Sequence, residues 1–143
     1  MSRAPGTRCR EITALLVPAD DCRPVRLVRV EDRAQVYSEL IGGGLLDETP
    51  LLLPDGQTVA LYLDEDRVAV GLPRNPRAAR LADRLHLRPR TPLELRGDLL
   101  VTGLGRGATD TDVPSAVLAA ACSSGLIEPQ HSDPPSGDGT GSG

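Results

Sequence analysis

The chain has 143 residues, with 16 basic and 20 acidic side chains and a formal net charge of −4. This length predicts one domain with a real core, which must be aliphatic because Tyr37 and Tyr62 are the only aromatic residues. Net acidity and the lack of aromatic stacking platforms argue against direct binding of nucleic acid.

The sequence shows no signal for a membrane, a disulfide framework or a zinc site. No apolar run approaches the roughly 18 residues of a membrane span, and the first residues lack a signal-peptide pattern. Cys9, Cys22 and Cys122 form no C-x-x-C pair and have no His nearby, which predicts free thiols. We therefore expect a cytoplasmic protein with no membrane partner.

The two ends differ in composition from the rest of the chain. Residues 1–10 lack periodicity, and residues 127–143 form a tail rich in Gly, Ser and Pro. Such segments bury too little apolar surface to offset the entropy of ordering, so both ends are predicted to be disordered. Residues 11–126 then form the single folded domain.

The first half of the domain contains signals for strands, turns and one helix. Residues 11–20, EITALLVPAD, predict a buried strand ending at Pro18, and PVRLVRV at 24–30 predicts a second strand paired with it. Apolar residues at helical spacing in 31–44 predict a helix that ends at three glycines. Those glycines follow the helix, whereas a phosphate-binding loop would precede it.

Residues 49–73 read as a meander. Two turn signals, at 54–56 and 64–66, separate three short β-prone runs. In the middle run, Tyr62 is expected to face away from Leu61 and Leu63, because successive side chains of a strand point to opposite faces.

The segment GLPRNPRAARLADRL at 71–85 predicts a helix start. Asn75 is a favoured N-cap residue, and Pro76 falls at the first helical position, where its missing N–H costs nothing. One stripe at helical spacing is expected to be buried; it contains Ala78, Leu81, Ala82 and Leu85.

In the last part of the domain, residues 97–107 predict a strand running into a glycine-rich loop, and the segment 109–125 contains a predicted short alanine-rich helix. Asp112 is the expected N-cap of that helix, and Gly125 its stop. The predicted order is β-β-α-β-β-β-α-β-α. We expect an α+β fold: a small mixed sheet of hairpin and meander strands with two to three helices.

The arginines of residues 74–90 are the main functional candidate, because Arg77, Arg80, Arg84 and Arg88 recur at spacings that place them together on one face of the predicted helix. Dense Arg suits bidentate contacts to phosphate or carboxylate groups. The ordinary alternative is a solvated helix face, neutralised in part by the protein's own acids. The candidate partner-binding residues are Arg74, Arg77, Arg80, Arg84 and Arg88, with Arg90 nearby.

Other motifs give weaker signals. The glycines at 103, 105 and 107 follow a strand, but their spacing is not the G-x-G-x-x-G of a dinucleotide site, so a flexible turn is expected. Asp98, Asp110 and Asp112 lack a metal-binding pattern. His86 and His131 offer no Cys-His or Ser-His pair. The sequence therefore predicts no catalytic residues, no cofactor and no metal.

The order of these motifs resembles the family known as domain of unknown function 3846. The matching pieces span roughly residues 11–104 and include ITALLVPADD, PVRLVRVEDRAQVYSELIGG, LYLDEDRVAVGLPRNPRAARLA and GDLLVTG. The resemblance implies a shared architecture and an actinobacterial, phage or plasmid setting, but no catalytic residues. The loop at 103–107 and the tail depart from the pattern.

The resulting hypothesis is a non-enzymatic accessory protein that binds an anionic partner, a protein rather than nucleic acid, through the arginine helix. Two alternatives stay open: a nucleic-acid-binding protein, and a small enzyme with a phosphate-binding loop at 103–107. The sequence does not predict the oligomeric state.

Overall fold

In the computed structural model, which describes residues 10–87, 89 and 91–128, six strands form one sheet. The strands are β1 (Glu11–Val17), β2 (Arg26–Glu31), β3 (Leu46–Leu52), β4 (Thr58–Asp64), β5 (Leu99–Leu104) and β6 (Asp110–Thr111). Their order is β2-β1-β5-β4-β3, with β6 also paired to β5. Every pairing is antiparallel. The α+β class is confirmed, while the expected mixed sheet is antiparallel in the described residues.

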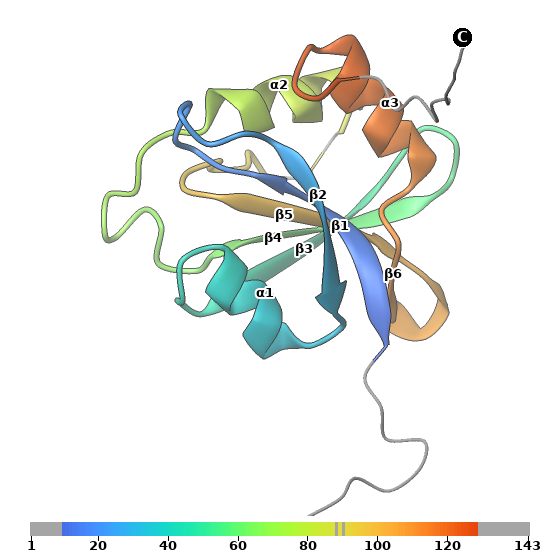
Figure 1. The fold of residues 1–143 in the computed structure, drawn as a ribbon, viewed down its shortest axis with the longest axis horizontal. Helices are drawn as coiled ribbons and strands as arrows, with labels where there is room; N and C mark the ends of the chain where they lie inside the picture. Colours follow the sequence, from blue (N-terminus) through green and yellow to red (C-terminus); the bar gives the residue numbers. More distant parts are fainter. Residues whose placement is uncertain (1–9, 88, 90, 129–143) are drawn as a thin grey trace, which may run out of the picture.

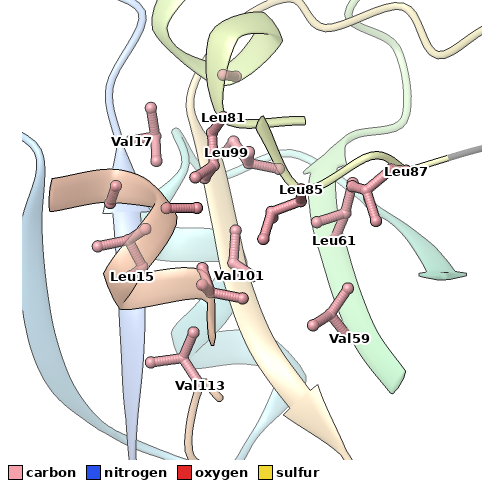
Figure 2. Close-up of a cluster of buried hydrophobic side chains, with 14 of the residues drawn as sticks. Leu15, Val17, Val59, Leu61, Leu81, Leu85, Leu87, Leu99, Val101 and Val113 are labelled. Atoms are coloured by element: carbon pink, nitrogen blue, oxygen red, sulfur yellow. The ribbon is translucent and has the colours of Figure 1, made fainter. Parts of the chain in front are cut away.

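Helices cover the two faces of the sheet unequally. Figure 1 shows α2 (Pro76–Arg84) and α3 (Ser115–Ser123) over one face and the short α1 (Ala34–Leu40) over the other. The face under α2 and α3 carries an aliphatic core, whose strand residues include Leu15, Leu61 and Val101 (Figure 2). Tyr62 lies in the separate cluster under α1, so the predicted alternation along β4 is confirmed.

The third β-prone run of the expected meander is not a strand. Residues 65–71 form turns. Val70 N–H donates a hydrogen bond to the Asp66 backbone carbonyl, and Leu72 N–H donates to the Arg67 backbone carbonyl. β4 already has β3 and β5 on its two sides, so no position beside it is left for this run. Val68 and Val70 are instead exposed.

β6 was not expected. It pairs with β5 through Gly103 and Leu104, on the side where β1 pairs with residues 99–101. The chain then continues along β1, where Val113 N–H donates to the Thr13 carbonyl. This short strand therefore fills the place that β1 leaves beside the end of β5.

Asp112 is not the N-cap of α3, which begins after Pro114 with no side-chain cap. Its carboxylate accepts a hydrogen bond from Thr13 N–H on β1 instead, at 2.8 Å. Gly125 does follow the end of α3, with a positive φ of 75°. Capping propensity placed the carboxylate on the helix, but the neighbouring strand is its actual partner.

The folded region extends slightly beyond the predicted limits. Arg10, assigned to the disordered N-terminus, donates to the Asp110 carbonyl and lies 3.5 Å from the Asp32 carboxylate. Ile127 packs against the core, although the tail was expected to begin there. The remaining predicted disorder falls on residues 1–9 and 129–143, outside the described part of the chain.

Candidate functional site

Helix α2 is held in place from its first residue. The Asn75 side chain accepts a hydrogen bond from Ala78 N–H at 2.9 Å, which confirms the predicted N-cap. Its amide nitrogen also donates to the carbonyls of Val17 and Gly97, both at 2.9 Å. Asn75 is buried. One side chain therefore caps the helix and joins it to the end of β1 and the start of β5.

Arg77 has an internal role that helical spacing did not reveal. Its Nη2 atom donates to the carbonyls of Pro18, Asp20 and Arg23, at 2.7 to 2.8 Å. The side chain is only 15% exposed. This guanidinium fixes the connection between β1 and β2 against α2, and its donors are directed into the protein.

The remaining candidate arginines divide into three kinds. Arg84 Nε donates to the Ser123 hydroxyl of α3 at 2.8 Å, so this side chain links the two helices. Arg74 and Arg80 are exposed, and their side chains have no hydrogen bond or ion pair within the described residues. Arg88 and Arg90 lie outside the described residues. Among the described candidates, two guanidinium groups without an internal partner therefore remain, one just before the N-cap of α2 and one in its middle.

A cavity of about 430 Å³ lies beside Arg74. Its walls come from the first turns of α2 and from the segment that returns to β5; they include Pro76, Ala79, Leu93 and Leu95. Glu94 also lines the cavity, and its carboxylate is paired with Arg96 at 3.1 Å. As far as the described residues show, the cavity thus combines apolar walls with the unpaired guanidinium of Arg74.

The glycine-rich loop is a turn, and it leads to a strand. The short 3-10 helix η1 (Arg106–Ala108) follows Gly105, and β6 comes next. A side chain at Gly103 would collide with the Asp112 carbonyl, so this glycine permits the close passage of the chain after β6. Arg106 is exposed at a cavity of about 400 Å³ formed by this loop. The long helix whose N-terminus would hold a phosphate does not follow the loop.

The three aspartates considered for a metal have separate roles. Asp98 accepts hydrogen bonds from Ala19 N–H and Arg23, whereas Asp112 accepts from Thr13 N–H. Asp110 is buried on the face under α1. Within the described residues, no group of three or more His, Cys, Asp or Glu residues is placed to hold a metal ion.

Both tyrosines of the chain meet in a polar cluster that the sequence did not predict. Their ring centroids are 4.9 Å apart. Tyr37 donates to Asp32 at 2.7 Å, and Tyr62 donates to Asp110 at 2.7 Å. Burial, and secondarily the bond to Asp32, raises the pKa of Tyr37. Burial and the bond to Asp110 likewise raise the pKa of Tyr62. The phenols are therefore held protonated as donors.

His86 and the cysteines form no catalytic pair in the described residues. His86 follows α2 with a φ of 58°, in the position after a helix end where glycine is preferred. Cys22 is exposed and Cys122 is half-buried, and both are free thiols as predicted. Cys9 and His131 lie outside the described residues.

Comparison with known proteins identifies a fold but no family. No protein-family model and no curated protein matches the sequence. The crystal structure of the small RNA methyltransferase HEN1 is similar in fold, with a TM-score of 0.55 and 15% sequence identity. The match covers 81% of this chain and 16% of that chain. No helix among the described residues is long and apolar enough to cross a membrane.

Proposed function

We propose that the protein is a non-enzymatic interaction module that binds an acidic protein segment at Arg74 and Arg80. The single observation that supports this role is the pair of exposed guanidinium groups without partners among the described residues, Arg80 on a helix that is fixed in place and Arg74 just before its N-cap. Arginine forms planar, bidentate hydrogen bonds with carboxylates, which suits such a partner.

The cavity beside Arg74 refines the chemistry of the partner. Its apolar walls fit an aliphatic side chain, while Arg74 at its margin fits a neighbouring carboxylate. An apolar anchor in a pocket with charges at the rim is a common arrangement in protein interfaces. The preferred ligand is therefore a segment in which acidic and aliphatic residues alternate.

A fluorescein-labelled peptide of alternating Glu and Leu residues tests this proposal by fluorescence anisotropy. We expect binding, and a loss of affinity of about tenfold or more when Arg74 and Arg80 are both replaced by Gln. Random duplex DNA should not compete. Effective competition by DNA, together with a steep salt dependence, would favour the nucleic-acid-binding alternative.

The matched control replaces Arg26 and Arg106 by Gln. Both side chains are exposed and have no partner within the described residues, so this variant loses the same charge elsewhere on the surface. If the two double variants weaken binding equally, net charge explains the interaction and the proposed site is wrong. A pull-down with the same pair of variants applies the comparison to native partners.

A further inference from the structure

The outer edge of β3 is an unpaired strand edge with apolar residues at both ends. β3 is the last strand of the sheet on its side, and no described strand pairs with its outer edge. Leu45, just before the strand, and Leu52, its last residue, are 67% and 65% exposed. An open edge of this kind presents free N–H and C=O groups to another strand.

The hydrogen bonds at the two ends of the β3–β4 pair show which residues face outward. Leu53 N–H donates to Gln57, and Glu65 N–H donates to the Leu45 carbonyl. In an antiparallel pair, hydrogen-bonded and non-hydrogen-bonded positions alternate. The odd-numbered residues of β3 therefore bond to β4. The even-numbered ones direct their backbone groups outward: Leu46, Glu48, Pro50 and Leu52.

Pro50 and Glu48 restrict how a strand can add to this edge. Pro50 has no N–H to donate, and two copies aligned with Glu48 opposite Glu48 would bring like charges together. One antiparallel register places Glu48 of each copy opposite Pro50 of the other. In this register, the only hydrogen bonds missing from the ladder between the two β3 strands are those that a backbone N–H at each Pro50 would have donated.

The same register brings the apolar side chains of two copies together. Leu46 of one copy then lies opposite Leu52 of the other, on the face under α1. Thr49 lies opposite its own counterpart on the twofold axis, at a position where the β3 strands form no direct hydrogen bond. A cavity of about 520 Å³, lined by Thr49 and by Pro92 and Leu93, adjoins this edge. The edge is therefore complementary to itself in one register.

We infer that two copies of the chain associate through antiparallel pairing of their β3 strands. The pairing joins two six-stranded sheets into one and closes with twofold symmetry, so it stops at a dimer. Pairing of β3 with β2, which carries Arg26 and Arg29, would match opposite charges. That contact is heterologous, however, and would generate a series of larger species.

Disulfide trapping tests the register directly. In a chain whose three cysteines are replaced by Ser, Thr49→Cys should form a covalent dimer rapidly on mild oxidation. Opposed residues at such positions have Cα atoms about 4.5 Å apart, within the range of a disulfide. Gln57→Cys, in the exposed β3–β4 turn, is the control and should remain monomeric at the same concentration. Equal rates for the two variants would overturn the inference.

Sedimentation of the unmodified chain provides the second measurement. We expect a monomer–dimer equilibrium, and a rise of about tenfold or more in the dissociation constant for Leu52→Lys. Val70→Lys introduces the same charge at a similarly exposed residue of the 65–71 turn, which is not part of β3, and should leave the constant unchanged. A monomer at all concentrations, a ladder of species beyond the dimer, or equal effects of both variants would each contradict β3 self-pairing.

Discussion

At the residue scale, buried polar side chains tie segments distant in sequence to one another. Arg67 is buried and donates to the Asp47 carboxylate at 2.8 Å and to the Asp64 carbonyl at 3.0 Å. Arg77 and Arg96 also donate to main-chain carbonyls. A guanidinium has several donors in a rigid plane, which allows one side chain to satisfy several carbonyls. Several arginines of this acidic protein are therefore structural.

Asn75 shows how much one such side chain contributes. Asn75→Ala removes a helix cap and leaves the carbonyls of Val17 and Gly97 without their donor. We expect the free energy of unfolding to fall by about 2 to 4 kcal/mol, measured by urea denaturation. Asn75→Asp keeps the cap acceptor but loses the donors, so it separates the two contributions. A loss below about 1 kcal/mol in Asn75→Ala would contradict this assignment.

The two buried tyrosines predict a dependence of stability on alkaline pH. Their pKa values are raised in the folded protein, so above about pH 10 the unfolded chain releases phenolic protons that the folded protein retains. The stability contribution is therefore present below pH 10 and is lost as the pH rises. Tyr37→Phe should lower the steepness of this loss in unfolding experiments between pH 9 and 11. An unchanged slope would show that Tyr37 ionises normally in the fold.

At the scale of elements, the two sides of α2 should respond differently to loss of charge. Arg77→Gln removes the guanidinium that holds three carbonyls of the β1–β2 connection, so the free energy of unfolding should fall by about 1 to 3 kcal/mol. Arg80→Gln removes an exposed side chain without a partner among the described residues. This substitution should change the free energy of unfolding by less than about 0.5 kcal/mol. Thermal or urea unfolding of both variants checks the difference. Equal effects would place Arg77 on the solvent face.

The pairing of β5 and β6 depends on the absence of a side chain at Gly103. Gly103→Ala would push the chain after β6 away from β5, because the new methyl group would meet the Asp112 carbonyl. We expect a marked loss of stability and faster hydrogen exchange at Thr111 and Val113. Gly107→Ala is a useful comparison, because its φ of 70° strains the loop without affecting the strand pair. Stability equal to wild type in Gly103→Ala would contradict the close approach.

Local patterns predicted the elements well. The strand ending at Pro18, the Asn75 cap and the buried positions Ala78 and Leu81 follow from neighbours within one or two turns of chain. The failures involve distant partners. Asp112 bonds to β1 and not to α3, and the run at 68–72 finds no place beside β4. Such outcomes depend on tertiary packing, which overrides local propensity.

The candidate site was only partly predictable for the same reason. Spacing placed Arg77, Arg80 and Arg84 together on α2. It gave no sign that backbone carbonyls of residues 18–23 would accept the hydrogen bonds of the Arg77 guanidinium. The tyrosine cluster was also missed, because Tyr37, Tyr62 and Asp110 come from three separate segments. Partner binding at Arg74, Arg77, Arg80, Arg84 and Arg88, and the resemblance to a family of unknown function, stay predictions.

At the scale of the whole molecule, β5 should be the most protected part of the sheet. It is buried and paired on both sides, with β1 and β6 on one and β4 on the other. We expect its amides to exchange with solvent most slowly, through global unfolding alone. Amides of α1, a helix of seven residues, should exchange much faster. Comparable rates in β5 and α1 would contradict this order.

The central position of β5 in the sheet also determines the order in which parts of the sheet can form while the polypeptide is being synthesised. The β1–β2 and β3–β4 hairpins can each close early, because each joins strands that are adjacent in the sequence. They pair with each other only through β5, which is synthesised much later. Until then, two hairpins with uncovered apolar faces emerge from the ribosome, and such surfaces are prone to aggregate and to recruit chaperones. The nascent chain, in the interval before β5 appears, is therefore the stage at which this protein most needs protection.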